Sequence, residues 1–435
     1  MNNYSAASVT LTSARPHSNA DRLLVWNILG TPVITDLSYS PGDYVVFIPA
    51  EAEINPRIIS VLNLYRHTEK NADPSLKAGY IEDSGRVRTV RLRGEYSAGL
   101  VIRMDPFMEA VRKIAPEAQP PTGEFINIGD LWITRKYVSK RTYNTKSTNE
   151  PARGKRTSRL IKNQFRFHED TAQLGRNLFK FGKDTPVHVT EKYHGSSAIY
   201  SRLLTKRKLS LLERLARFLG VRVQESEYGF VYGSRRVIKN EFDDNSNKQH
   251  YYKTDLWAEA AQKLDIENKL EDGITLYGEL VGYVPSTGSP IQRFGKYAYH
   301  YLSGRSEVKF IVYRITQTSN SGRVYEFTPE QIKSYCTQHA LAYPVTHFIG
   351  KFGEFHQSSD DDIISAIRKT PMASGPCPWN DPAPREGIVI RRLDVPYWEA
   401  YKVKSLEFLE QETKANDNNE TNIEDDSDNE HEFQQ

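Results

Sequence analysis

Lys192 is the side chain best placed in this sequence to act as a nucleophile. It ends a strand-like alternating run, residues 187–192, and Gly195 follows three positions later. A lysine amine attacks phosphorus only when neutral, so neighbouring cations or burial must lower its pKa. Lys402 and Lys404 lie two apart in another strand-like run and therefore point to one side. We expect them to lower the pKa of Lys192 and to bind an α-phosphate. Taken alone, alternating lysines are more typical of an exposed edge strand.

Two glutamates adjoin glycines at the boundaries of strand-like runs. Glu386 precedes Gly387, and Glu279 follows Gly278. A glycine at such a point lets the backbone come close to a ligand. Glu386 suits a divalent metal held through its waters, as phosphoryl transfer requires. Glu279 suits ribose hydroxyls and is the second candidate metal ligand, although either carboxylate alone is more typical of a protein surface.

Other side chains are candidates for recognising the nucleotide. Arg235 suits a ribose or phosphate group, because a guanidinium fork matches these groups better than an ammonium does. Tyr313, with Phe310 as the alternate, is suited to stacking on a purine, although a buried strand aromatic is the commoner role. Zinc is not expected, because three histidines near Lys192 lack the spacing of a zinc site: His168, His188 and His194.

The charge of the chain is distributed unevenly. Its 435 residues carry a net charge of +3, yet residues 135–183 are dense in Lys and Arg, and the stretch from residue 410 onward is acidic. A basic stretch suits a polyanionic backbone, because phosphate contacts release counterions. A solvated surface linker is the alternative. The candidate RNA contacts are His194, Arg236, Arg153, Lys155 and Arg156.

Composition excludes several classes of protein. The 38% hydrophobic content over this length allows one or two cores. No apolar run is long enough to cross a bilayer, and the first residues lack the apolar block of a secretory signal. Two distant cysteines, Cys336 and Cys377, do not make a disulfide framework. We expect a cytoplasmic protein that acts as a monomer.

The patterns along the chain predict an α+β protein with two folded bodies. Residues 1–135 read as short strands broken by turns, which favours a small all-β barrel of the oligonucleotide-binding (OB) type. Within them, residues 86–93 alternate and place arginines mostly along one edge. A basic linker is expected over residues 136–159 and a second body of antiparallel sheets with helices over residues 160–410. The acidic residues 411–435 are expected to be disordered.

One helix in the second body has an amphipathic pattern with a basic face. Within residues 209–219, leucines and a phenylalanine recur at helical spacing, and Arg214 and Arg217 lie on the other side. Packing against the body is the expected role of this helix. Contact with nucleic acid is the less expected one.

Six segments occur in the order of a known motif set. They are Lys192-Tyr193-His194-Gly195, Ser234-Arg235-Arg236, Tyr277-Gly278-Glu279, Phe310-Ile311-Val312-Tyr313, Glu386-Gly387-Ile388-Val389-Ile390 and Lys402-Val403-Lys404. The set resembles that of covalent nucleotidyltransferases, the superfamily of ATP-dependent RNA ligases, DNA ligases and mRNA capping enzymes. Within it the chain looks like the RNA ligase 2 branch, and most like the Deinococcus-type ligases with an OB module ahead of an ATP-grasp-like core. The resemblance adds Glu191 and Gly195 to the ATP-binding candidates.

The resemblance implies an ATP-dependent RNA ligase that joins 3′-hydroxyl and 5′-phosphate ends, with nicked RNA or RNA–DNA duplexes as partners, in RNA repair. Lys192 would form a lysyl-AMP adduct, AMP would pass to the RNA 5′-phosphate, and the 3′-hydroxyl would displace it. Mg²⁺ or Mn²⁺ would stabilise charge in the first step. The alternatives are a capping-type guanylyltransferase and a non-catalytic RNA-binding protein. Two features depart from the pattern: a long segment between Lys192 and Arg235, and Arg314 where an aspartate is common.

Overall fold

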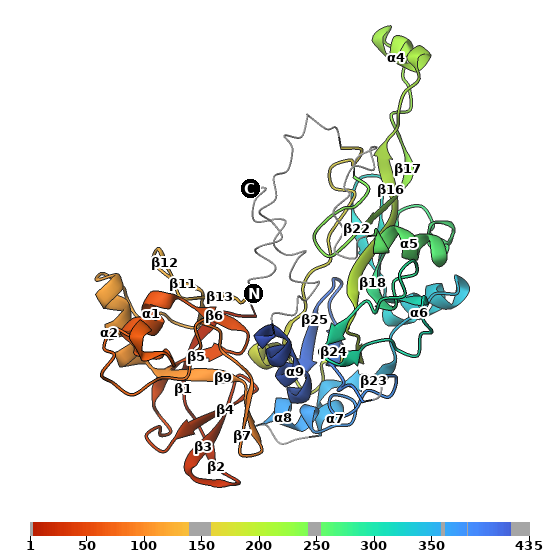
Figure 1. Cartoon of the computed structure of the whole chain (residues 1–435). Helices are drawn as coiled ribbons and strands as arrows, with labels where there is room; N and C mark the ends of the chain where they lie inside the picture. The colour runs from red at the N-terminus through yellow and green to blue at the C-terminus, as the bar shows by residue number, and fades with distance from the viewer. Residues whose placement is uncertain (1–2, 139–157, 242–253, 358–361, 381, 419–435) are drawn as a thin grey trace.

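The computed structural model describes residues 3–138, 158–241, 254–357, 362–380 and 382–418. These residues form an N-terminal body and a larger second body (Figure 1). The two together are a mixed α+β structure in which antiparallel sheets dominate. No helix in the described ranges is long and apolar enough to cross a membrane. The expected basic linker lies mostly outside these ranges, with Arg153, Lys155 and Arg156 among the residues left out.

The N-terminal body is built from short strands. They are β1 (Ala6–Thr10), β2 (Ala14–His17), β3 (Ala20–Ile28), β4 (Thr31–Asp36), β5 (Tyr44–Pro49), β6 (Ala52–Ile54), β7 (Val90–Leu92), β8 (Glu95–Ser97), β9 (Gly99–Arg103), β10 (Glu124–Phe125), β11 (Asn127–Ile128), β12 (Leu131–Trp132) and β13 (Thr134–Lys136). The central strand β5 pairs with β1 and β9. Its apolar run is unbroken because both faces are covered: Val46 and Ile48 enter one cluster, and Val45 and Phe47 enter another.

Two helices show that this body is not all-β, contrary to our expectation. They are α1 (Pro56–Val61) and α2 (Met104–Ile114). The buried face of α2 carries Phe107, Met108 and Val111, which join the cluster under β5. Their spacing is that of a helix face and was present in the sequence. The OB assignment of residues 1–135 stays a prediction.

The second body contains two five-stranded sheets in the described residues. Its strands are β14 (Ala172–Gln173), β15 (Pro186–Lys192), β16 (Ser196–Lys206), β17 (Ser226–Gly233), β18 (Ile274–Gly282), β19 (Arg293–Phe294), β20 (Tyr297–Ala298), β21 (Val308–Thr318), β22 (Val324–Glu326), β23 (Thr346–Lys351), β24 (Gly387–Arg392) and β25 (Ala400–Lys404). One sheet has the order β14-β25-β24-β15-β23, and the other has the order β17-β16-β18-β21-β22.

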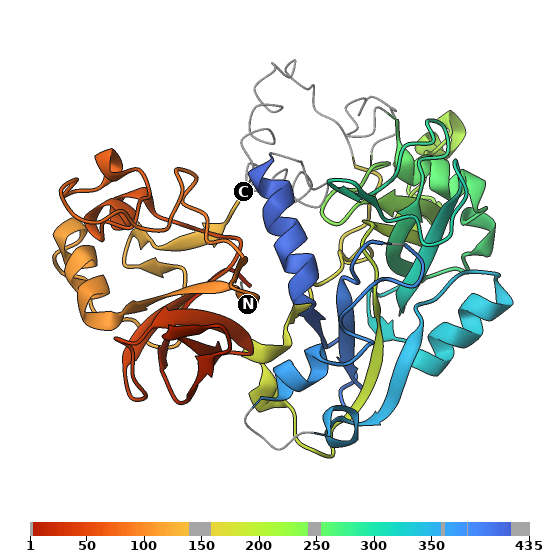
Figure 2. The same ribbon diagram turned by 60° about the horizontal axis from the view of Figure 1, so that its bottom comes forward.

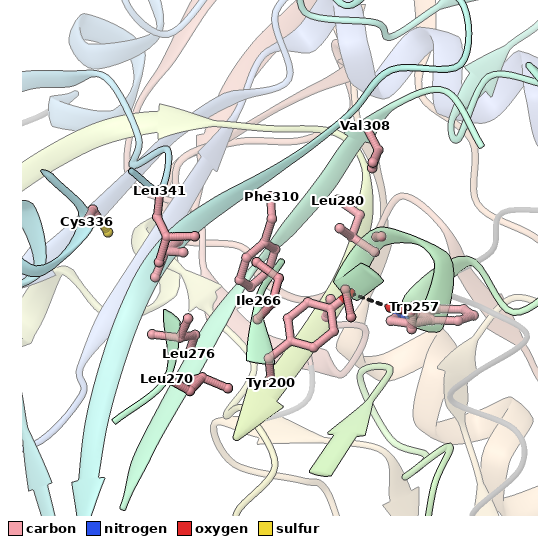
Figure 3. Packing of buried hydrophobic residues seen from close by; sticks show 14 of the residues in the cluster. Tyr200, Trp257, Ile266, Leu270, Leu276, Leu280, Val308, Phe310, Cys336 and Leu341 are labelled. Carbon is pink, nitrogen blue, oxygen red and sulfur yellow. Dashed lines mark hydrogen bonds between the residues drawn. The ribbon is translucent and has the colours of Figure 1, made fainter. Parts of the chain in front are cut away.

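Helices complete the second body. They are α4 (Leu211–Phe218), α5 (Leu256–Lys263), α6 (Pro329–Gln338), α7 (Phe352–His356), α8 (Ile363–Arg368) and α9 (Leu406–Asp417). Helices α5 and α6 pack against the β18 sheet and close its largest apolar cluster (Figure 3). In this cluster the Tyr200 hydroxyl donates a hydrogen bond of 2.8 Å to the carbonyl of Trp257. Every residue of β18 is buried, which makes it the central support of the sheet.

Helix α4 does not pack against the body as expected. It forms the far end of the β16–β17 hairpin and projects away from the sheets (Figure 1). A capping box between Ser210 and Glu213 starts the helix. Its apolar side chains stay in solvent, with Leu211, Leu212 and Phe218 exposed by 80% or more. The less expected role, contact with nucleic acid, stays a prediction.

Helix α9 corrects the expectation for the acidic tail. Residues 411–417, which we expected to be disordered, continue the helix that Ser405 caps. The helix lies between the two bodies (Figure 2). The arginines of residues 86–93 do not form a free edge: Arg86 is buried against Asp417, and Arg91 lies 3.5 Å from Glu410. The helix is therefore held by partners in both bodies, and its own composition does not reveal them.

Candidate active site

Three lysines share one face of the β15 sheet. The register places Lys192 opposite Gly387, and Gly387 opposite Lys404. Residues directly opposite in antiparallel strands point to the same side, and Lys402 shares it because it lies two residues before Lys404. The other face of these strands packs into an apolar cluster. The sheet therefore holds the three predicted cations on the side away from the core.

Gly387 keeps the space between two of these lysines open. Its φ of 142° is disfavoured for other residues, and a Cβ here would come within 2.0 Å of the Val403 carbonyl oxygen. The preceding residue, Glu386, turns its carboxylate into this space. Its Oε1 lies 2.9 Å from the Nζ of Lys192 and 3.9 Å from the Nζ of Lys404. The predicted nucleophile and its predicted metal ligand are thus in direct contact.

The Glu386 carboxylate has an unsatisfied oxygen. The residue is 4% exposed, and its Oε2 has no hydrogen-bond partner among the described residues, where the Nδ1 of His194 lies 3.8 Å away. A buried acceptor of this kind is costly unless a cation or a ligand approaches it. The described residues contain no group of three or more His, Cys, Asp or Glu side chains arranged around a metal. The orphaned Glu386 oxygen fits a divalent ion as a single protein ligand, and water and phosphate oxygens would complete the shell of that ion.

The turn after Lys192 is fixed to the second sheet. The Gly195 amide donates to Glu279 Oε1 over 3.1 Å, and the Gly195 carbonyl accepts from Gln292 Nε2 over 3.1 Å. A Cβ at Gly195 would lie 2.2 Å from the Leu280 carbonyl oxygen. Only glycine fits this approach, which brings the predicted Glu279 next to the lysine turn.

Two predicted contacts do not fit their placement. The Glu191 side chain lies on the opposite face from Lys192, where it pairs with Arg385 and with His347 at 2.8 Å. A carboxylate there is not directed toward a nucleotide at the lysines. His194 is 4% exposed and packs edge-on against Phe408, at 5.0 Å between ring centroids. This burial does not fit the RNA contact that we expected of it.

Arg235 and Arg236 converge on an aspartate that sequence reasoning missed. Asp170 accepts from the Arg235 Nε at 3.0 Å and from the Arg236 NH2 at 2.7 Å. Burial favours the protonated acid, but the two arginines outweigh it and lower the pKa of Asp170. Its place two residues before β14 was the available signal. The pair of cations is therefore held in a fixed place.

The two stacking candidates have opposite surroundings. Phe310 lies in the apolar core beside Tyr200 (Figure 3), so it is not available to a purine. The register pairs Val312 with Gly278 and Arg314 with Tyr277, which leaves Tyr313 as the extra residue of a bulge. A bulge redirects a side chain relative to a regular strand. Tyr313 is half-buried, which leaves it as the stacking candidate.

Aromatic neighbours surround Tyr313. Its ring lies 5.0 Å from that of His168 and 6.2 Å from that of Trp398. Burial, followed by the charge of Arg314, lowers the pKa of His168 well below its usual value, so the imidazole is neutral. Arg314, which replaces the common aspartate, is paired with Glu326 at 2.9 Å. Trp398 was not predicted, because nothing near it in sequence marks it.

Glu412 is a third residue that sequence reasoning missed, after Asp170 and Trp398. Its oxygens lie 3.0 and 3.1 Å from the Nζ of Lys404. Burial opposes the charge of this lysine, but Glu412 and Glu386 outweigh it and raise the pKa of Lys404. The same contact lowers the pKa of Glu412 despite its burial. Lys404 is therefore held as a cation, and its shortest contact is to Glu412, which the sequence analysis did not name.

Comparison with known proteins shows what the fold is similar to and which family the chain belongs to. Its fold is similar to that of Naegleria gruberi RNA ligase solved with ATP and Mn, at a TM-score of 0.58 and 18% identity over 93% of this chain and 98% of that one. The same ligase with PPi gives a TM-score of 0.58 and 18% identity over 95% of this chain and 100% of that one. A variant of it with AMP and Mn gives a TM-score of 0.58 and 17% identity over 93% of this chain and 98% of that one. No curated protein matches by sequence. The RNA ligase family matches residues 185–404, half of the chain and the whole span from β15 to β25. The chain belongs to the RNA ligase family.

Proposed function

We propose that this protein is an ATP-dependent RNA ligase that seals 3′-hydroxyl and 5′-phosphate ends through lysyl-AMP and RNA-adenylate intermediates. The observation that carries the proposal is the shared face of Lys192, Lys402 and Lys404, with the buried Glu386 between two of them. A nucleophile beside clustered cations is what attack on a nucleotide α-phosphate requires.

The chemistry follows from this arrangement. Lys192 leaves its ion pair with Glu386, gives up a proton to solvent and attacks the α-phosphate of ATP. A P–N bond forms as the P–O bond to pyrophosphate breaks. Lys402 and Lys404 bind the phosphate oxygens on which charge increases. AMP then passes to the 5′-phosphate of RNA, and the 3′-hydroxyl displaces it to close the strand.

The cofactor is Mg²⁺ or Mn²⁺, held by Glu386 and, in the second place, by Glu279. When bound, the ion offsets negative charge on the phosphates. The unsatisfied Glu386 oxygen supports this assignment. The remaining nucleotide contacts are Arg235 at the ribose or phosphate, Tyr313 at the purine, and the close backbone approach at Gly195.

The proposed substrate is a nick in a duplex with RNA. The N-terminal body, as an OB module of the Deinococcus-type ligases, would clamp the duplex together with the basic residues 136–159 and Arg236. We propose a cytoplasmic monomer that acts in RNA repair. Support comes from the basic composition of that stretch and from the position of the N-terminal body beside the ligase core (Figure 2).

Covalent labelling tests the proposal directly. The purified protein is incubated with α-labelled ATP and Mg²⁺ or Mn²⁺, and the labelled peptide is mapped by mass spectrometry. We expect AMP on Lys192, no label on Lys192→Ala, and full label on a matched surface control, Lys263→Ala. A label that persists in Lys192→Ala, or one obtained from GTP and not from ATP, would contradict the proposal.

A further inference from the structure

Helix α9 begins directly after Lys404 and is tied to the site from its first residue. The Ser405 amide donates to the Glu386 carbonyl over 3.0 Å, and the Ser405 hydroxyl accepts from the Phe408 amide over 3.0 Å. This cap starts the helix at a fixed point relative to Glu386. Two turns later the helix brings Glu412 back to Lys404.

Helix α9 supplies two contacts to the Lys404 ammonium. Both oxygens of Glu412 accept hydrogen bonds from its Nζ, and the Phe408 ring centroid lies 5.2 Å from the same atom. The remaining carboxylate contact, to Glu386, is longer at 3.9 Å, and Glu386 is already paired with Lys192. A lysine carries its charge at the end of a flexible side chain. The contacts with Glu412 and Phe408 therefore determine the position of the Lys404 ammonium.

The far end of α9 is anchored in the N-terminal body. Glu51 there accepts from the Thr413 hydroxyl and from the Asn416 amide, each at 2.6 Å. Arg86 pairs with the same Glu51 at 2.8 Å and donates to the Thr413 carbonyl over 3.2 Å. Glu412 is thus followed at once by a residue whose side chain and backbone are both held by the other body. The carboxylate has little freedom to move along or around the helix.

We propose that Glu412 is a positioning residue for the ligase reaction, which fixes the Lys404 ammonium where the α-phosphate binds. The inference rests on the proposed function, because it gives Lys404 a phosphate to bind. Glu412 does not touch the reacting atoms in this arrangement and acts through its hydrogen bonds to Lys404. The helix that carries it makes this placement depend on the packing of the two bodies.

The test compares two single-charge removals on the same helix. Glu412→Gln keeps the size of the side chain and removes the charge at Lys404. Glu410→Gln is the matched control, since Glu410 pairs with Arg91 and Lys414 and not with Lys404. The assay is single-turnover formation of lysyl-AMP over a range of ATP concentrations, at a temperature where circular dichroism shows every variant folded. We expect Glu412→Gln to lower the maximal rate about tenfold, with a smaller change in the ATP concentration at half-maximal rate.

A double-mutant cycle separates positioning from general stabilisation. In a Lys404→Met background, the added Glu412→Gln should change the rate less than about twofold, because the ammonium that Glu412 positions is gone. The double variant also avoids a buried unpaired charge, which favours folding. The inference would be overturned if Glu412→Gln formed lysyl-AMP as fast as the wild-type protein or faster. It would also be overturned if adding Glu412→Gln to Lys404→Met lowered the rate by a further tenfold. Absence of label on the wild-type protein would instead reject the proposed function itself.

Discussion

Helices α4 and α9 differ in what they contact, and the difference is opposite to what their sequences suggest. Helix α4 has a regular apolar face, yet Phe218 on that face is 86% exposed. Helix α9 is acidic and polar, yet Phe408 is fully buried. An apolar face shows that a helix can pack, but a partner at the right distance decides whether it does. The comparison can be tested with matched pairs of substitutions.

The largest difference is expected from the two phenylalanines. Phe408→Ala removes a ring that packs against His194 and Tyr299, and should lower the free energy of unfolding by about 4 kcal/mol. Phe218→Ala on α4 should change it by less than about 0.5 kcal/mol, because the ring is in solvent. Denaturant unfolding of both variants measures this. Similar losses for both would mean that α4 packs in solution.

A smaller difference is expected from two arginine ion pairs. Arg86→Met leaves Glu51 buried without its cation beside α9, and should lower the free energy of unfolding by about 3 kcal/mol. Arg217→Met breaks the exposed pair with Glu225 beside α4, and should cost less than about 1 kcal/mol. Thermal and denaturant unfolding compare the two. If Arg86→Met left the free energy of unfolding unchanged, the contact of Arg86 would not hold α9 to the N-terminal body.

The smallest effect is expected from pH. The pKa of Glu412 is lower in the folded state than in the unfolded chain, so its pair with Lys404 adds stability above the unfolded pKa. This contribution is lost as pH falls through the folded pKa. The melting temperature of the wild-type protein should therefore exceed that of Glu412→Gln near pH 6, and the gap should shrink toward pH 3. A gap that stays constant over this range would contradict the ion pair.

The lysine site was predictable because its signals are local. The alternation that ends at Lys192, the spacing of Lys402 and Lys404, and the glycine after Glu386 all lie within short segments. Strand periodicity then places the three lysines on one face once the strands pair. The helical spacing of Phe107 and Val111 in α2 is an equally local signal, although we did not predict this helix.

Contacts that come from distant parts of the chain were not predictable in this way. The choice between Phe310 and Tyr313 depends on a bulge opposite Tyr277 and Gly278, which no pattern in β21 reveals. The Glu191 and His194 side chains were assigned by proximity in sequence to Lys192. Glu191 lies on the opposite face of the sheet, and His194 is buried beside Glu386, with its Nδ1 3.8 Å from the Oε2 of that carboxylate. Asp170 and Glu412 were missed because their partners lie at least 8 residues away, and in the case of Asp170 more than 60.

The sequence by itself determined which residues can carry the chemistry, since side-chain type and strand or turn geometry are set by near neighbours. The requirement for glycine at positions 195 and 387 came from the tertiary structure, because the atoms that a Cβ would meet belong to Leu280 and Val403. Only the tertiary structure decided which helix is buried, which carboxylate holds Lys404, and what the arginines near residue 86 contact. These depend on surfaces that meet across hundreds of residues, and the energy of such a contact is absent until both surfaces have formed.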